Sequence, residues 1–173
     1  MTGRVAQRLA DLEVELPSVA APVGAYVPAL VDGDHVLTSG QLPVVDGEIS
    51  STGVVGTAGG GPAQASTVDG AVVTPEEATA LARTCAINAL AAVRHALGGD
   101  EDALDRVEQV VKVVGYVASA PGFTGQPGVV DGASQLLGEV FGDAGVHARS
   151  AVGVAALPLG APVEVELTVR VRG

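Results

Sequence analysis

A chain of 173 residues has the length of one compact domain, and 47% hydrophobic against 17% charged residues is typical of a globular protein rather than a disordered one. The net charge of −11, with nine basic residues and 2% aromatic residues, excludes the cationic, base-stacking surfaces on which nucleic-acid binding depends. The same acidic balance argues against anionic membranes. We therefore expect one globular domain that binds neither nucleic acid nor a membrane.

Residues 1–19 predict an N-terminal helical segment, because Val5, Leu9 and Leu12 repeat at helical spacing. Acidic residues interrupt the apolar run that a signal peptide would need in this segment. Cys85 is the single cysteine of the chain and permits no intrachain disulfide. We expect a cytoplasmic protein whose main domain spans residues 20–173.

A β-hairpin and a long loop are predicted next along the chain. Two β-rich runs separated by Asp32-Gly33 are typical of a hairpin. Residues 46–73 are rich in glycine, serine and threonine, with three consecutive glycines at 59–61. Such a segment loses much conformational entropy on ordering and buries little surface, so we expect a loop over 46–73.

Two helices and three strands complete the prediction. Thr74 as the N-cap, Pro75 in the first turn and Glu77 at the third helical position predict the start of a helix, which the glycines at 98–99 should end. A second helix is expected over 129–141, and β-branched runs predict strands over 106–119, 148–156 and 162–172. The order β-β-α-β-α-β-β predicts a single α+β domain, with two helices packed against one sheet.

No spacing in the sequence supports a metal or phosphate site. His35, His95 and His147 are far apart and have no second ligand at metal-binding spacing, so each is expected at the surface or half-buried. The glycine-rich run has Pro62 where a phosphate loop requires lysine. Cys85 falls on the apolar face of its helix and is expected to be an inert core residue. We therefore expect no metal site.

Arg149 is the residue whose surroundings suggest chemistry. Strand alternation places it on one face with small side chains that leave space, and a guanidinium suits a carboxylate bound at two points. The alternative, which spacing alone favours, is a structural ion pair across the strands with Glu164 or Glu166. The small residues that share the face of Arg149 are Ala151, Gly153 and Ala155.

Two blocks of the sequence, "PVGAYVPALVDGDHVLTSGQLP" and "HARSAVGVAALPLGAPVEVE", resemble the Rid family, also called YjgF-like or endoribonuclease L-PSP proteins. The resemblance covers about residues 20–172. It implies a chorismate-mutase-like fold and a homotrimer with ligand clefts between its subunits.

The resemblance also implies a set of site residues. Arg149 matches the family arginine that grips the substrate carboxylate, and Glu164 matches the glutamate that positions or activates the attacking water. Tyr26 and Gly40 match substrate-binding positions, with Gly40 approaching the ligand through its backbone. The resemblance also assigns Ala151 to substrate binding, at a position where many family members have a cysteine.

The activity that the resemblance implies is that of a 2-iminobutanoate/2-iminopropanoate deaminase-like hydrolase, which converts 2-imino acids to 2-oxo acids and ammonia. Such a hydrolase needs no cofactor, because the imine carbon is already electrophilic and the protein has only to anchor a carboxylate and present a water. A non-catalytic trimer that binds small carboxylates as a sensor is the second hypothesis. The older family label suggests a third, an endoribonuclease and translation inhibitor, which the net charge opposes.

Overall fold

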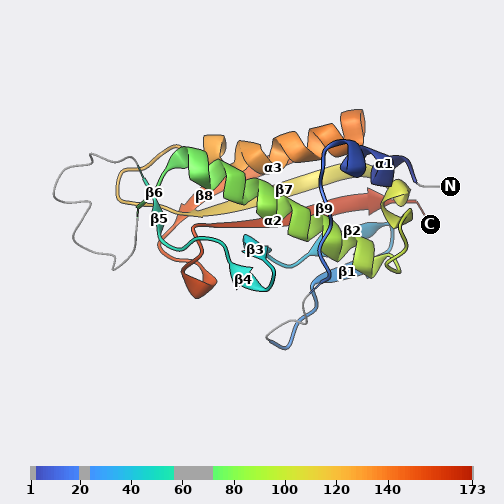
Figure 1. The fold of residues 1–173 in the computed structure, drawn as a ribbon, viewed down its shortest axis with the longest axis horizontal. Coiled ribbons are helices and arrows are strands. Elements are labelled where there is room, and N and C mark those ends of the chain that lie inside the picture. Colours follow the sequence, from blue (N-terminus) through green and yellow to red (C-terminus); the bar gives the residue numbers. More distant parts are fainter. Residues whose placement is uncertain (1–2, 20–23, 57–71, 173) are drawn as a thin grey trace.

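The computed structural model describes residues 3–19, 24–56 and 72–172, which form one sheet and a layer of helices (Figure 1). The helices are α1 Arg4–Asp11, α2 Pro75–Ala96 and α3 Gln126–Phe141, with short 3-10 turns at Ala103–Arg106, Gly142–Gly145 and Pro158–Gly160. The main sheet contains β1 Ala29–Asp32, β2 His35–Thr38, β7 Val107–Ala118, β8 Ala148–Val154 and β9 Val163–Val171.

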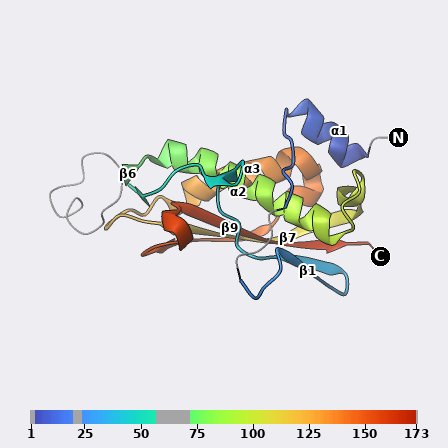
Figure 2. The same cartoon turned by 60° about the horizontal axis from the view of Figure 1, so that its bottom comes forward.

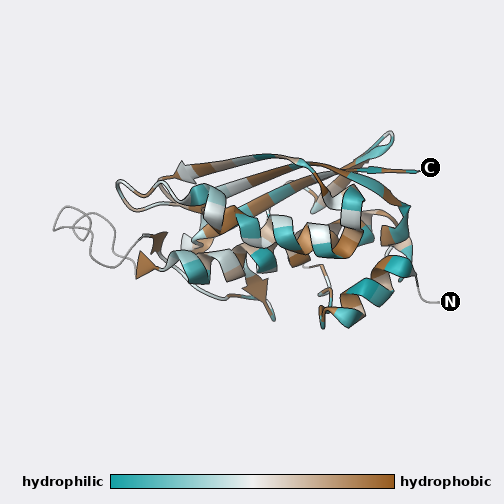
Figure 3. Cartoon of the chain, turned by 90° about the horizontal axis from the view of Figure 1, so that it is seen from above, coloured by the Kyte–Doolittle hydropathy of each residue, from teal (hydrophilic) through white to brown (hydrophobic). Residues whose placement is uncertain are grey.

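The five main strands lie in the order β1-β2-β9-β7-β8, antiparallel throughout except for the parallel pair β7–β8. Helices α2 and α3 pack on one face of this sheet, and α1 lies against α3 on the outer side of that layer (Figure 2). The opposite face carries no helix in the described part of the chain, as the two layers in Figure 3 show. The predicted order β-β-α-β-α-β-β and the α+β fold class are confirmed.

The predicted start of α2 is confirmed in detail. The hydroxyl oxygen of Thr74 accepts the backbone N–H of Glu77 at 3.2 Å, and Pro75 occupies the first turn, where a missing N–H costs nothing. The helix ends before Gly98, whose φ of +109° suits glycine. Cys85 is fully buried on the inner face, as the sequence indicates, in a core built almost entirely from valine, leucine and alanine.

Three details of the fold differ from the sequence prediction. The register pairs Asp32 with His35, so the hairpin turn consists of residues 33–34 rather than 32–33. Helix α3 begins at Gln126, three residues before the expected start at 129. The loop predicted over 46–73 contains short strands in its described part, while residues 57–71 lie outside the described residues. The short strands of this region are β3 Val44–Val45, β4 Glu48–Ile49, β5 Val54–Val55 and β6 Val72–Val73.

Helix α1 is capped by a residue distant in sequence. Gly3 precedes the helix and supplies no side chain, but the Asp105 carboxylate accepts the backbone N–H of Arg4 at 2.8 Å and of Val5 at 2.7 Å. We expect Asp105→Ala to lower the free energy of unfolding by about 1 kcal/mol, because two helix-terminal donors lose a charged acceptor. Thermal unfolding measures the loss. The exposed Asp100 provides the control, and an equal shift for Asp100→Ala would contradict the assignment.

Candidate functional site

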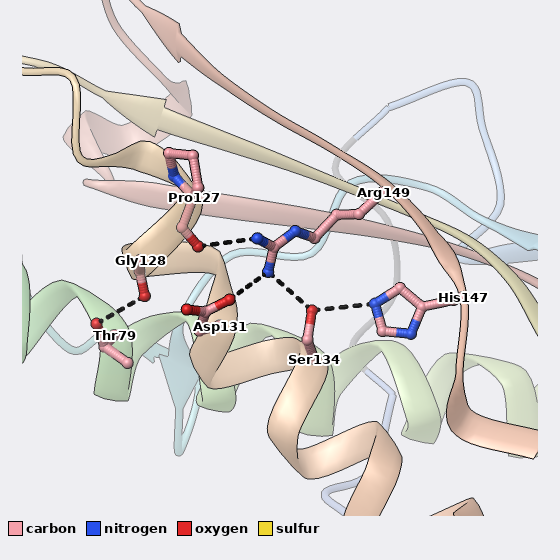
Figure 4. Close-up of polar contacts among 7 residues, drawn as sticks. All are labelled: Thr79, Pro127, Gly128, Asp131, Ser134, His147 and Arg149. Carbon is pink, nitrogen blue, oxygen red and sulfur yellow. Dashed lines mark hydrogen bonds and ion pairs between the residues drawn. The ribbon is translucent and has the colours of Figure 1, made fainter. Parts of the chain in front are cut away.

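Arg149 lies on the edge strand β8 and reaches over to α3 (Figure 4). Its register partner is the buried Val113, so its side chain points to the helix-covered face of the sheet. One terminal nitrogen, Nη1, donates to Asp131 Oδ1 at 2.7 Å and to Ser134 Oγ at 3.0 Å. The other, Nη2, donates to the backbone carbonyl of Pro127 at 3.1 Å.

These contacts decide which ion pair Arg149 forms. Its carboxylate partner is Asp131 on α3. The expectation of a cross-strand pair with Glu164 or Glu166 is therefore wrong. Strand alternation indicates only the neighbours of Arg149 within the sheet, whereas its carboxylate partner belongs to the helix that packs on the strand.

The hydrogen bonds continue from Arg149 through Ser134 to His147. His147 Nδ1 lies 2.6 Å from the carbonyl oxygen of Gly145, and Nε2 lies 3.0 Å from Ser134 Oγ. Because a carbonyl only accepts, Nδ1 must carry the proton, and the neutral ring then accepts the Ser134 hydroxyl at Nε2. This tautomer assignment leaves the Ser134 oxygen free to accept from Arg149, so one chain of bonds joins all three side chains.

The small residues beside Arg149 are partly covered within the chain. A Cβ atom at Gly153 would lie 2.8 Å from Gln126 Nε2 and 3.0 Å from Ser119 Oγ. Ala151 is half-buried and packs against the main core. Gln126 in the first turn of α3 thus lies against Gly153, but Gly153 and Ala155 remain exposed, so an open pocket over this face stays a prediction.

Glu164 lies on β9 and packs against Gly40. A Cβ atom added to Gly40 would overlap the Glu164 carboxyl group, so only glycine leaves room for that carboxyl against the backbone. The close approach follows from the register, since Gln41, the next residue, forms a bridge with Val165. Two residues that the family resemblance selects are thus in contact.

The Glu164 carboxyl is half-buried, and its pKa is raised. Desolvation by burial raises the pKa of Glu164, and the nearby charge of Glu166 raises this pKa further. The Tyr116 hydroxyl, across the strand pair, donates to Glu166 Oε2 at 3.4 Å. Burial and the charge of Glu166 also raise the pKa of Tyr116, so this phenol stays protonated. Glu164 is therefore a stronger base, once ionised, than an ordinary glutamate.

The raised pKa of Glu164 predicts how stability depends on pH. A carboxyl whose pKa is higher in the folded state contributes stability below its unfolded pKa, and this contribution is lost as the pH rises through the folded value. We therefore expect Glu164→Gln to unfold at a higher temperature than wild type at pH 7. The difference should vanish below pH 4.5, the ordinary glutamate pKa, in melting curves recorded at both pH values. A variant less stable than wild type at pH 7 would contradict the proposed desolvation.

Arg149 and Glu164 lie on opposite faces of the sheet. Tyr116 is the register partner of both Glu164 and Val152, so these three side chains share the face without helices. Arg149 precedes Val152 by three positions on a regular strand and must point to the other face. Strand β7 also separates the two residues. A single chain does not bring this predicted pair together.

Tyr26 immediately precedes the segment that binds Ser39, the residue before Gly40. Tyr26 is 56% exposed. Beside it, the Ser39 hydroxyl donates to the carbonyl of Val27 at 2.6 Å and the Ser39 backbone N–H donates to the carbonyl of Pro28 at 2.9 Å.

Within the ranges that the structure describes, no group of three or more histidine, cysteine or acidic side chains is arranged to hold a metal ion. No helix in those ranges has the length and apolar character required to cross a membrane.

Three residues form a network with Arg149 that the sequence pattern does not predict: Asp131, Ser134 and His147. Their spacing does carry a signal. Asp131 and Ser134 are three positions apart and so share a helix face, and His147 precedes Arg149 by two positions, which aligns their side chains. The pattern does not indicate that this helix face meets this strand.

The fold and the site together define the class of protein. One five-stranded mixed sheet with two long helices on one face is the architecture of chorismate-mutase-like α+β proteins. A family model described as "YjgF/chorismate mutase-like, putative endoribonuclease" matches residues 6–170. The chain belongs to this YjgF family.

Individual relatives agree with the family assignment. Protein TCP17 from Trypanosoma cruzi is 43% identical over 169 residues, which are 97% of this chain and 94% of that protein. A protein of unknown function from Agrobacterium tumefaciens is 39% identical, with a TM-score of 0.79 over 97% of this chain and 93% of its own. A protein from Shewanella oneidensis is 30% identical, with a TM-score of 0.81 over 96% of this chain and 99% of its own. The similarity therefore extends along the whole fold.

Proposed function

We propose that this chain is one subunit of a homotrimeric hydrolase that converts small 2-imino acids to 2-oxo acids and ammonia in clefts between subunits. Arg149 binds the substrate carboxylate, and Glu164 accepts a proton from the attacking water. The observation that carries the proposal is the Glu164 carboxyl, half-buried against Gly40 with a raised pKa. We place this reaction of small metabolites in the cytoplasm.

The opposite orientation of the two key residues supports a site shared between subunits. A cleft that uses both must take Arg149 from one subunit and the Gly40–Glu164 pair from its neighbour, with Tyr26 on the side of Gly40. The uncovered face of the sheet suits such a contact, because it exposes apolar side chains near both of its edges. These are Leu30 (58% exposed), Leu37 (42%) and Val152 (44%).

Substrate binding would compete with Asp131 for Arg149. The Asp131 side chain is 51% exposed and the Arg149 side chain 23%, so Asp131 is the partner with freedom to move. A substrate carboxylate offers the same two-oxygen geometry to the guanidinium. TdcF from Escherichia coli, which shares the fold at 22% identity and a TM-score of 0.56, is described with bound serine. Serine also carries a carboxylate of this kind.

The hydrolysis needs only water besides the imino acid. Glu164 removes a proton as the water oxygen bonds to the imine carbon, and the imine nitrogen gains a proton. The resulting carbinolamine loses ammonia as its hydroxyl proton leaves and the carbonyl forms. The raised pKa of Glu164 favours the first proton transfer, which general-base catalysis accelerates by about 10²–10⁴-fold in enzymes.

The test is the release of ammonia from 2-aminoacrylate, a reactive enamine whose tautomer is a 2-imino acid. A second enzyme generates this compound in the assay. We expect wild type to accelerate ammonia release, and Glu164→Gln to slow it about 100-fold while pyruvate binding is kept. Glu108→Gln, on the outer part of β7 and paired with Arg170 at 3.5 Å, provides the matched control and should keep full activity. Wild-type protein that releases ammonia no faster than buffer would contradict the proposal.

A second candidate function is a trimeric sensor that binds small carboxylates without turnover. The observation that favours it is the Arg149 network, which is complete without any contribution from Glu164. It predicts that pyruvate raises the melting temperature of wild type and of Glu164→Gln equally, with no ammonia release by either. RNA cleavage, the third candidate, is opposed by the net charge of −11.

A further inference from the structure

We infer that Ser134 is an activated nucleophile, with His147 as its base, and that it takes the acyl group of small esters. This activity differs from imine hydrolysis and does not depend on Glu164. The inference rests on the arrangement of Ser134, His147 and Arg149 shown in Figure 4, and on the contact of His147 with the Gly145 carbonyl.

The first requirement of such a pair is a base within reach of the nucleophile and held in the correct tautomer. Ser134 Oγ lies 3.0 Å from His147 Nε2, and the Gly145 carbonyl binds the opposite ring nitrogen at 2.6 Å. In serine hydrolases a carboxylate performs this second task, by fixing the ring and its proton on the far nitrogen. Here the backbone carbonyl of Gly145 fixes the same tautomer, and the burial of Gly145 holds this carbonyl in position.

The second requirement is a charge that stabilises the oxygen anion formed during the reaction. Arg149 Nη1 lies 3.0 Å from Ser134 Oγ and favours negative charge at this position. Asp131 lies 2.7 Å from the same guanidinium and offsets part of its charge. The network thus favours loss of the Ser134 proton to the imidazole as the nucleophile attacks.

The third requirement is access for an acyl donor. Ser134 and His147 are half-buried, and the network lies between α3 and the edge strand β8, which has no neighbour on its outer side in the described chain. The guanidinium would face the carbonyl oxygen of the donor. As donors we therefore assign esters of short acids, which place little bulk against the half-buried Ser134.

The reaction balances with the ester and water alone. Ser134 Oγ bonds to the ester carbon as its proton passes to His147 Nε2, and the tetrahedral intermediate expels the alcohol, which takes that proton. Water then attacks the acyl-serine with His147 as the base, and this step releases the acid and restores the Ser134 hydroxyl.

Covalent labelling of the whole chain tests the inference. Wild-type protein is treated with an alkyl fluorophosphonate, and intact mass and peptide mapping identify the modified residue. We expect one adduct, on Ser134, and labelling about 100-fold slower in His147→Gln, whose amide cannot take a proton. The rate at which His147→Gln hydrolyses p-nitrophenyl acetate should fall by a similar factor.

Ser150 provides the matched control for this experiment. It is also half-buried, accepts a hydrogen bond from Lys112 at 2.9 Å and lies on the other face of β8, so Ser150→Ala should label like wild type. Circular dichroism of His147→Gln should match wild type, which separates loss of the base from loss of the fold. An unlabelled wild type, an adduct on another residue, or equal labelling of wild type and His147→Gln would each overturn the inference. Glu164→Gln should label normally, which separates this result from the fate of the imine hydrolase proposal.

Discussion

Replacement of Arg149 by alanine should abolish carboxylate binding and reduce ammonia release from 2-aminoacrylate to the rate in buffer. A guanidinium binds a carboxylate through parallel charge-assisted hydrogen bonds, which contribute about 1.5–3 kcal/mol each. Their loss weakens binding by more than about 100-fold, which calorimetric titration with pyruvate measures. Arg149→Lys should recover only part of the affinity, because an ammonium cannot form the fork.

The control for this variant is Arg83→Ala. Arg83 also pairs with a carboxylate on α3, Glu139 at 2.8 Å, but from helix α2. Both variants therefore lose one ion pair to the same helix, and Arg83→Ala should keep carboxylate binding. If Arg149→Ala bound pyruvate as tightly as wild type, Arg149 would not be the carboxylate anchor.

Replacement of Gly132 by alanine should lower the free energy of unfolding by about 1–3 kcal/mol, the usual cost of adding a methyl group to a packed interface. Gly132 lies where α3 crosses α2, and an added Cβ atom would overlap the Thr79 carbonyl oxygen and lie 2.9 Å from its carbon. Because these atoms belong to the helix backbone, only a shift of one helix can relieve the overlap. Chemical denaturation measures the loss.

Gly138 provides the control on the same helix. A Cβ atom at Gly138 would have no atom within 4 Å, so Gly138→Ala should raise the free energy of unfolding by about 0.5–1 kcal/mol through the better helix propensity of alanine. Opposite signs for the two variants would support the packing assigned to α2 and α3. Equal effects would mean that propensity, and not contact, governs both positions.

Much of the fold is predictable because local patterns determine it. The alternation of Val163, Val165 and Leu167 gives the buried face of β9, and the cap at Thr74 gives the start of α2. The start of α3 is harder to predict, because Pro127 and Gly128 are residues typical of loops. Proline is nonetheless tolerated in the first turn of a helix, where its missing N–H has no partner to lose.

The candidate site is less predictable, because its contacts are tertiary. Strand alternation gives the neighbours of Arg149 within β8 but not the helix above it, so Asp131 and Ser134 were not identified as partners. The same alternation places Glu164 opposite the core but does not reveal that its carboxyl lies on Gly40. That contact depends on how the residues after β2 approach β9.

A complementation experiment tests the shared site most directly. Arg149→Ala and Glu164→Gln proteins, each inactive alone, are unfolded together and refolded as an equal mixture. If each cleft takes Arg149 from one subunit and Glu164 from the next, random assembly leaves about one quarter of the clefts intact. We therefore predict about one quarter of the wild-type rate of ammonia release from the mixture. A mixture no more active than either parent would contradict a site built between subunits.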